Sequence, residues 1–277
     1  MSVIKRIFSS GMNGIVNGIT NGISEGVRSI RSIQNLEWST NRHSIVEIAG
    51  KKVFKKEFSA INSLPIRIGY TYAAFNYPTF DLRSYSVQSR IENEYKKNDA
   101  LKQLGMNTPI IYNRDDRAIY MELIDGQNLF EFFQAEDMTA VREVTEDLAT
   151  KMKLLHDLNY SFVDLKAENV MVMTNPRNGS RLCFVDGEFF TEHADRFQKD
   201  LDLSTFLWSV SRLKPDKYKL IFEIFSSIYE IDPYDRDKIL EYVTNLSLVA
   251  GIFSPRELTY TKNRAKNILE LTRQSLS

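Results

Sequence analysis

The chain has 277 residues, 43% of them hydrophobic and 26% charged, which is typical of a globular protein with one large or two small domains. Its 36 basic and 36 acidic residues cancel, so no overall charge directs it to nucleic acid, and its single cysteine, Cys183, excludes a disulfide framework and favours a reducing compartment. No apolar run reaches the roughly 20 residues that span a bilayer, so we expect a cytoplasmic protein that does not bind nucleic acid.

Residues 1–35 are predicted to form an amphipathic, glycine-rich arm that is separate from the rest of the chain. Glycine recurs at positions 14, 18, 22 and 26, and apolar residues such as Ile15, Ile19 and Ile23 share one face of the segment if it is helical. Each glycine costs a helix about 1 kcal/mol, so a stable isolated helix is not expected. The alternatives are that the arm packs on its own domain or is partly disordered, that it binds a membrane surface or a partner, or that it self-associates.

Strands and one long helix are predicted between residues 36 and 126. Alternating runs rich in Val, Ile and Phe indicate a β-hairpin with its turn at Gly50-Lys51, and a long charged stretch that stops at Gly105 indicates a helix. Residues 60–83, rich in aromatic side chains, are predicted to be an irregular insertion that packs on this region, with a docking surface as the alternative. The predicted strands are His43–Ala49, Lys52–Phe58, Ile110–Tyr112 and Ala118–Ile124, and the predicted helix is Ser84–Leu104.

Residues 127–277 are predicted to be mostly helical. Apolar residues recur at helical spacing in the long segments, for example at positions 144, 148, 152 and 155. Strands with one helix, followed by helices with one small hairpin, form an α+β pattern with two lobes, 36–126 and 127–277. The predicted helices are Val141–Leu158, Asp202–Leu213, Lys217–Tyr229, Tyr234–Ala250 and Pro255–Ser277, and the predicted strands are Val170–Thr174 and Leu182–Val185.

Three side chains that suit phosphoryl transfer lie between residues 164 and 186. Asp164 and Asn169 are five residues apart in a loop that joins a long helix to a strand, and Asp186 follows the next strand and precedes Gly187. A phosphoryl group in transfer carries negative charge, and Mg²⁺, which neutralises it, prefers a few oxygen ligands and water. We expect Asn169 and Asp186 to hold Mg²⁺ and Asp164 to accept a hydrogen bond from the attacking hydroxyl. The alternative is a capped helix end followed by two turn aspartates.

The stretch Asp164-Leu-Lys-Ala-Glu-Asn169 resembles the Asp-Leu-Lys-Pro-Glu-Asn catalytic loop of Ser/Thr protein kinases, and Asp186-Gly187 resembles the start of their metal-binding Asp-Phe-Gly motif. Small atypical kinases are most similar in type: the KEOPS-complex kinase, the RIO kinases and the lipopolysaccharide (heptose) kinases. The resemblance covers roughly residues 40–215. It implies a two-lobed protein-kinase-like fold with a small β-rich N-lobe, a helical C-lobe and ATP and Mg²⁺ between them. Lys166 would sit beside the transferred phosphate.

The resemblance also implies a lysine and a glutamate in the N-lobe. A kinase holds the α- and β-phosphates of ATP with a strand lysine, which a helix glutamate orients. Lys55 is the predicted lysine, and Lys56 is the alternative because a shift of one residue places a side chain on the other face of a strand. Glu94 is the predicted glutamate, and Glu92 is its alternative.

Two further segments resemble parts of the same family. Tyr120–Gly126 resembles the hinge of the KEOPS-complex kinases, which implies that the backbone of Glu122 and Ile124 binds adenine and that Met121 is the gatekeeper. Lys199–Leu203 resembles the Asp-Leu segment that braces the catalytic loop, and the alternative for it is an ordinary acidic helix start.

Several departures from the kinase pattern affect the expected function. Phe162-Val163 replace the usual His-Arg, the stretch after Asp186 is short and lacks an Ala-Pro-Glu motif, and no glycine-rich loop precedes the first strands. Activation through a phosphorylated loop is therefore not expected, and residues 39–46 would have to cradle phosphate with their amides. Glu188 adds a carboxylate that is either a further metal ligand or solvated.

The predicted function is ATP- and Mg²⁺-dependent transfer of the γ-phosphoryl group to a hydroxyl, with a serine or threonine of a protein substrate as the first choice. The alternatives are a small-molecule kinase acting on a sugar or lipid-linked hydroxyl, a pseudokinase binding module, and an ATPase whose output is conformational. The short stretch after Asp186 favours the first alternative, and the missing glycine-rich loop favours the second.

Overall fold

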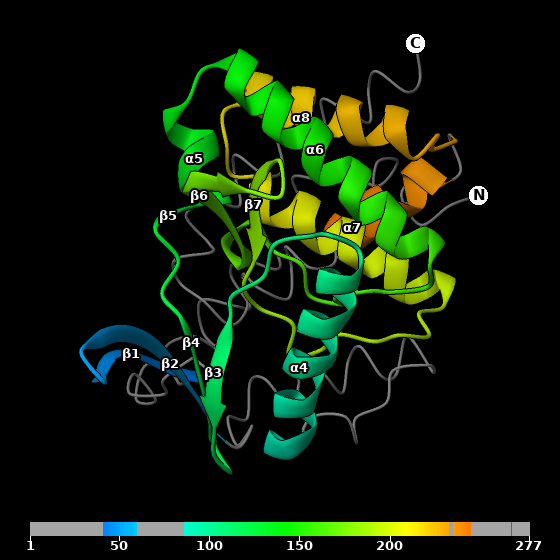
Figure 1. The fold of residues 1–277 in the computed structure, drawn as a ribbon. Coiled ribbons are helices and arrows are strands. Elements are labelled where there is room, and N and C mark those ends of the chain that lie inside the picture. Colours follow the sequence, from blue (N-terminus) through cyan, green and yellow to red (C-terminus); the bar gives the residue numbers. More distant parts are fainter. Residues whose placement is uncertain (1–40, 60–85, 233–234, 245–266, 268–277) are drawn as a thin grey trace, which may run out of the picture. The chain divides into compact units, whose positions relative to one another are not determined.

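The computed structural model describes residues 41–59, 86–232, 235–244 and Asn267. The predictions for the arm 1–35, for the insertion 60–83 and for nearly all of the helix Pro255–Ser277 lie outside the described residues. The described chain is α+β, because an antiparallel sheet with one long helix comes first and a largely helical region follows (Figure 1). This order confirms the predicted α+β class and is compatible with two lobes.

The first sheet has four antiparallel strands in the order β1-β2-β4-β3. The predicted hairpin is present, and its turn at Ala49 and Gly50 has the positive φ angles, 51° and 75°, that two-residue hairpin turns favour. Side chains alternate between the two faces of a strand, so Lys55 and Lys56 point to opposite sides of this sheet. The strands are β1 (Asn41–Ile48), β2 (Lys51–Phe58), β3 (Ile111–Arg114) and β4 (Ala118–Glu122).

Helix α4 (Val87–Gln103) packs against this sheet and carries charged side chains on its buried face. Ile91 joins a small apolar cluster with side chains from β2 and β4. Arg90, Glu94 and Lys97 are each at most 1% exposed. Because residues three and four apart lie on one side of a helix, these three side chains form a charged stripe on the face toward the rest of the molecule.

In the described part of the chain, a second, three-stranded sheet and four α-helices follow, with a further helical stretch at 235–244. Asn128, Asp137 and Asp195 precede three of these helices, and their side chains accept hydrogen bonds from first-turn N–H groups. One large apolar core joins the helices to the sheet, with Phe206 and Phe225 in contact at its centre. The elements are β5 (Gly126–Asn128), α5 (Leu129–Ala135), α6 (Met138–Asp157), the 3-10 helix η3 (Ala167–Asn169), β6 (Val170–Arg177), β7 (Ser180–Phe184), α7 (Arg196–Val210) and α8 (Pro215–Ile228).

Three elements differ from the sequence prediction, and the first is α5, for which no separate helix is predicted. α7 begins at Arg196, well before the predicted start at Asp202, because Asp195 and Gln198 form a capping box. β5 is not predicted at all, since its pairing depends on backbone proximity: a Cβ on Gly126 would lie 2.3 Å from a backbone oxygen of β6. Residues 235–244 are helical, as expected. None of the helices in the described ranges combines the length and apolarity required to cross a bilayer.

Candidate active site

The loop between α6 and β6 holds Asp164, Lys166 and Asn169 in defined positions. Lys166 Nζ lies 2.7 Å from Asp164 Oδ2, and Asn169 Nδ2 donates to the Asp164 carbonyl oxygen at 3.0 Å. The side chains of Asp164 and Lys166 are 33% and 36% exposed, so both can contact a ligand. The structure therefore brings together the three loop residues that the sequence singles out.

Asp202 on α7 is completely buried and fixes this loop from behind. Its carboxylate accepts hydrogen bonds from the Ser161 hydroxyl and the Phe162 N–H, both at 2.7 Å. The N–H of Leu165 donates to the same carboxylate at 3.3 Å. Within the segment Lys199–Leu203, Asp202 is thus the residue that binds the loop and holds its backbone in position.

Val163 stands between these anchored residues in a strained backbone conformation. Its φ angle is +66°, which is rare for a β-branched residue. Its N–H donates to the Ser161 hydroxyl at 3.0 Å, and that hydroxyl is itself bound to Asp202. Strain of about 1–3 kcal/mol persists only where surrounding contacts enforce it, so the network around Asp202 is what holds the residue preceding Asp164.

Asp186 comes two residues after the end of β7 and lies beside the loop. The N–H of Val185 donates to the Asn169 carbonyl oxygen at 3.0 Å, which ties the strand end to the loop. Asp186 Oδ1 lies 2.7 Å from Lys56 Nζ and accepts a bond from the Glu188 N–H at 3.3 Å. Asp186 and Asn169 therefore belong to one site.

Lys56, and not Lys55, is the strand lysine of this site. Lys56 Nζ lies 2.6 Å from Glu94 Oε1 and 2.7 Å from Asp186 Oδ1, and its side chain is only 3% exposed. Lys55 projects from the opposite face of β2 and pairs with Glu57 at 2.9 Å. The assignment of Lys55 to this position is wrong and its alternative occupies it, because only one of two successive lysines can face α4. Glu94, the predicted helix glutamate, is the residue on α4 that pairs with Lys56.

Lys56 belongs to a charge network of three cations and three carboxylates, most of which are buried. Glu94 pairs with Lys97 through its second oxygen at 2.9 Å. Glu188 pairs with Arg90 at 2.7 Å and lies 3.8 Å from Lys56. At 7% exposure Glu188 is not solvated, which removes one of its two predicted alternatives. The cations of the charge network are Lys56, Lys97 and Arg90, and its carboxylates are Glu94, Asp186 and Glu188.

The charge network also fixes the first strand and the residue after Asp186. Asn41 accepts a hydrogen bond from Arg90 at 2.6 Å and donates one to Glu188 at 2.8 Å, so β1 is tied to the segment beyond β7. A Cβ on Gly187 would lie 2.4 Å from Cδ of Lys97. The side chain of Lys97 thus occupies the space that the Cβ of any larger residue at position 187 would need.

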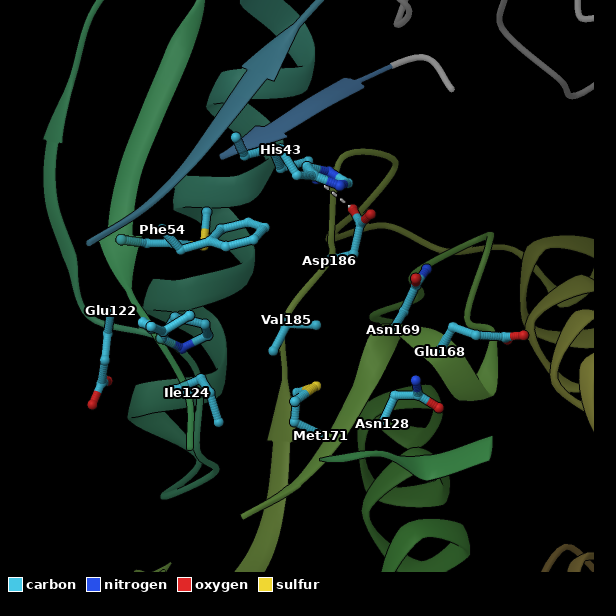
Figure 2. Close-up of a pocket in the computed structure, with 14 residues that line it drawn as sticks. His43, Phe54, Glu122, Ile124, Asn128, Glu168, Asn169, Met171, Val185 and Asp186 are labelled. Carbon is cyan, nitrogen blue, oxygen red and sulfur yellow. Dashed lines mark hydrogen bonds and ion pairs between the residues drawn. The ribbon is translucent and has the colours of Figure 1, made fainter. Parts of the chain in front are cut away.

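A cavity of about 290 Å³ opens beside the charge network (Figure 2). This volume lies near the lower end of the range for small-molecule sites, about 300–1,000 Å³. The rings of His43 and Phe54, 5.3 Å apart, stand on one side of it, and Met171 lies on the other. The lining residues are His43, Phe54, Lys56, Pro109, Met121, Glu122, Leu123, Ile124, Asn128, Glu168, Asn169, Met171, Val185 and Asp186.

Glu122 and Ile124 both line the cavity, but in different ways. The N–H of Glu122 donates to the Ile110 carbonyl oxygen at 2.8 Å, and its carboxylate turns away from the cavity to pair with Arg177 (Figure 2). A ligand can therefore bind the backbone of Glu122 through its carbonyl oxygen and not through its N–H. Ile124, two residues further along, lines the same cavity.

The charged groups have perturbed pKa values. Burial raises the pKa of the Asp164 carboxyl above its ordinary value, and Lys166 opposes only part of this shift. Burial acts in the same direction on Asp186, but the ammonium group of Lys56 outweighs it and holds the pKa of that carboxyl well below its usual range. Burial opposes the charge on Lys56, yet Asp186 and the nearby glutamates keep its pKa above the usual lysine value. Lys56 and Asp186 are therefore a charged pair at neutral pH.

Asn169 and Asp186 could hold a divalent cation together with the phosphates of a ligand. Asn169 uses its Nδ2 for the Asp164 carbonyl, and Asp186 uses Oδ1 for Lys56, so each has a further oxygen for a cation. Mg²⁺ commonly takes one or two protein oxygens and completes its shell with phosphate and water. Within the described ranges no group of three or more His, Cys, Asp or Glu side chains is arranged to hold a metal by itself. The donor set thus fits Mg²⁺ bound with a phosphate.

The connection from Asp186 to α7, residues 187–195, is short and folded against the loop. The backbones of Ser161 and Thr191 exchange hydrogen bonds at 3.1 and 2.9 Å, and the Ala194 N–H donates to the Asn159 carbonyl oxygen at 2.8 Å. The ring of Phe190 is buried. This connection is held in place without a phosphorylated side chain.

Sequence reasoning missed Arg90, Lys97 and His43. Arg90 and Lys97 lie within one turn of Glu94 on each side, so helical spacing could have placed all three on one face, but a charged stripe on a helix ordinarily faces solvent. His43 could have been found from the hairpin register, which pairs it with Lys56. That signal requires the pairing to be known, and the sequence alone leaves Lys55 and Lys56 as alternatives.

The chain matches no family model, and no curated protein matches its sequence at a significant level. The functional conclusion is therefore based on the geometry of the site and on the motifs of the sequence.

Proposed function

We propose that the chain is an ATP- and Mg²⁺-dependent phosphotransferase with a kinase-like site, which transfers the γ-phosphoryl group of ATP to a serine or threonine hydroxyl of a protein. The observation that carries this proposal is Lys56, a buried strand lysine that contacts both Glu94 and Asp186 at the wall of the cavity. Asp186 and Asn169 line one end of that cavity, and Asn169 is hydrogen-bonded to the backbone of Asp164, so an acid and an amide stand where phosphoryl transfer requires them.

Each residue has a distinct task in this reaction. Lys56 binds the α- and β-phosphates, and Glu94 keeps its ammonium group oriented. Bound Mg²⁺ would be held by Asn169 and Asp186 and would supply neutralisation of the phosphate charge. Asp164 accepts the hydrogen bond of the attacking hydroxyl and orients that oxygen toward phosphorus. Lys166, 2.7 Å from Asp164, lies where it can bind the transferred phosphate.

The remainder of the cavity fits a nucleobase. Phe54 and Met171 stand on opposite sides of the space, so a flat ring system can pack between them (Figure 2). The carbonyl oxygen of Glu122 is an acceptor for an exocyclic amine, and the backbone of Ile124 provides the second contact of the proposed adenine site.

The test is phosphoryl transfer from γ-labelled ATP with Mg²⁺, with mixed cellular proteins as acceptors and without an acceptor. Asp186→Ala should abolish transfer, and Asp216→Ala, an exposed acid at the start of α8, should leave it unchanged. Labelled protein that disappears only in Asp186→Ala supports a protein kinase. Absence of both turnover and ATP binding in the wild-type chain would show that the proposal is wrong.

A small hydroxyl compound is the second candidate acceptor, and the short connection 187–195 favours it. In that connection Thr191 and Ala194 are hydrogen-bonded to the loop that carries Asp164. The segment that would otherwise support an extended peptide is therefore occupied by contacts within the site. Release of free phosphate without labelled protein in the same assay directs the search to sugar or lipid-linked hydroxyls, or to an ATPase.

A further inference from the structure

His43 projects from β1 toward the charged end of the cavity. Register pairs His43 with Lys56 across the hairpin, so both side chains emerge on the same face of the sheet. Of the described β1 residues only His43 lines the cavity, and its imidazole stands opposite Asp186 (Figure 2). The residue is solvent-exposed at the mouth of the cavity, and its ring packs 5.3 Å from that of Phe54.

The charge network offers no surplus of positive charge to an entering phosphate. The three cations of the charge network face three carboxylates, and Lys56 already contacts Glu94 at 2.6 Å and Asp186 at 2.7 Å. A cation at Asp186 would compensate the charge of those phosphate oxygens that face the loop between α6 and β6. The oxygens that face the first sheet need a donor from that sheet, because a phosphate buried without donors loses its hydration without replacement.

The hairpin does not supply that donor through a flexible glycine-rich segment. β1 is paired with β2 along its whole length, from Asn41 to Ile48, and the described hairpin has one glycine, Gly50, at its far tip. Among the described residues of β1, the side chain of His43 is therefore the hydrogen-bonding group that the cavity presents. An imidazole can donate at least one N–H in either protonation state.

We infer that His43 binds a phosphate group of the nucleotide from the side of the first sheet, in the position where backbone amides of a glycine-rich loop are missing. This inference rests on the proposed function, because it requires a nucleotide in the cavity. The ring contact with Phe54 keeps the imidazole oriented. Lys56, on the neighbouring strand β2, binds the same phosphates.

Three substitutions separate hydrogen bonding from ring packing. His43→Phe retains an aromatic ring beside Phe54 but has no N–H, whereas His43→Gln retains an N–H donor without the ring. Ser44→Ala is the matched control, because Ser44 is the next residue, is exposed, and pairs with Lys55 on the opposite face. Both positions, 43 and 44, are exposed, and thermal unfolding of each full-length variant verifies that it is folded.

The measurement is calorimetric affinity for adenosine and for ADP with Mg²⁺. His43→Phe should weaken ADP binding about tenfold, the value of one hydrogen bond to a charged group, and leave adenosine binding unchanged. His43→Gln should bind ADP within about threefold of wild type, and Ser44→Ala should be indistinguishable from wild type.

Other results overturn the inference in distinguishable ways. Unchanged ADP affinity in His43→Phe, with normal binding by the wild type, would eliminate the role of His43 and leave the proposed function standing. Equal weakening of adenosine and ADP would mean that the imidazole contacts the base. If the wild-type chain binds neither compound, the proposed function fails together with this inference.

Discussion

Lys56 is a buried ammonium group whose charge is balanced by two carboxylates within 2.7 Å of its nitrogen. A buried charge is tolerated because its partners replace the lost hydration. Loss of one partner therefore costs more than the pair itself contributes, since the remaining charges stay buried without compensation. Lys55, one residue earlier, has no such environment and contacts Glu57 at the surface.

Replacement of each lysine by methionine should therefore have very different effects. Lys56→Met should lower the free energy of unfolding by about 3–5 kcal/mol, because Glu94 and Asp186 lose a buried partner. It should also abolish phosphoryl transfer. Lys55→Met should change neither property appreciably. Urea denaturation at pH 7 and the transfer assay measure both, and similar behaviour of the two variants would contradict the assignment of Lys56.

Asp164 shows the opposite electrostatic situation, because the fold disfavours its charged form. Its pKa is raised by burial, so between its unfolded and its folded pKa the native state binds more protons than the unfolded state, and stability falls as pH rises. Asp164→Asn removes this penalty. The variant should be more stable than wild type at pH 7, and the difference should disappear below the ordinary aspartate pKa of about 3.9. A variant less stable than wild type at pH 7 would refute this account; denaturation curves across the pH range provide the measurement.

At the scale of elements, α7 positions the loop through one buried side chain. Asp202 binds the backbone N–H groups of Phe162 and Leu165, on both sides of the strained Val163. Asp200 lies on the same helix but is only partly buried, and it pairs with Lys238 at 2.9 Å. The two aspartates therefore allow a comparison within a single helix.

Asp202→Ala should reduce the free energy of unfolding by about 3 kcal/mol or more, because several buried donors lose their acceptor at about 1–3 kcal/mol each. It should also reduce kcat at least tenfold with little change in the KM for ATP, since the loop that carries Asp164 loses its position. Asp200→Ala should cost clearly less than Asp202→Ala, because the side chain of Lys238 is one-third exposed and water can replace its partner. Steady-state kinetics and denaturation test both variants, and a loss confined to stability would assign Asp202 a structural role alone.

The elements themselves were largely predictable, whereas the contacts that assemble the site were not. Alternation predicts the hairpin of β1 and β2, a long charged stretch that stops at Gly105 predicts α4, and helical spacing predicts α6, because all three signals are local. The choice between Lys55 and Lys56 depends on which face of β2 meets α4, which no local pattern specifies. Burial of Arg90 and Lys97 depends on contacts with Glu188 and with the Phe184 carbonyl, far along the chain, which no local pattern indicates.

The same limit applies to the residues around the proposed phosphate site. Asp164, Asn169 and Asp186 could be selected from the sequence because their spacing and chemistry are unusual. Glu188 was recognised, but its ionic partner Arg90 comes from α4, nearly a hundred residues earlier. Long-range pairing of this kind has no signature in a single sequence.

At the scale of the whole molecule, the cavity lies where the first sheet meets the second. Asn107, in the connection after α4, joins the two regions: its Nδ2 donates to three carbonyl oxygens of the β6–β7 hairpin at 3.0–3.1 Å. The backbone carbonyl oxygen of Asn107 accepts a hydrogen bond from the Phe184 N–H at 3.0 Å. Because the regions are joined on this side, a ligand between them should stabilise the described fold as a unit.

Mg²⁺ with ADP should therefore raise the unfolding temperature of the full chain. At a ligand concentration about one hundred times Kd the stabilisation is about 2.7 kcal/mol. Chelation of Mg²⁺ should remove part of the shift, and Asp186→Ala should show the smaller shift with or without the metal. A thermal shift that is absent in the wild type, or that is independent of Mg²⁺, would contradict the proposed metal role of Asp186.

Val163 has a consequence for how activity can be adjusted. An enforced left-handed conformation means that the loop has a relaxed alternative of lower local energy, which the hydrogen bonds to Asp202 and Ser161 oppose. The population of the loop conformation that positions Asp164 then depends on the difference between two opposing free energies, the backbone strain and the hydrogen bonds. Small changes in the packing of α7, far from any bound nucleotide, should shift that balance in graded steps. Turnover could thus be raised or lowered without altering a single group that contacts the substrate.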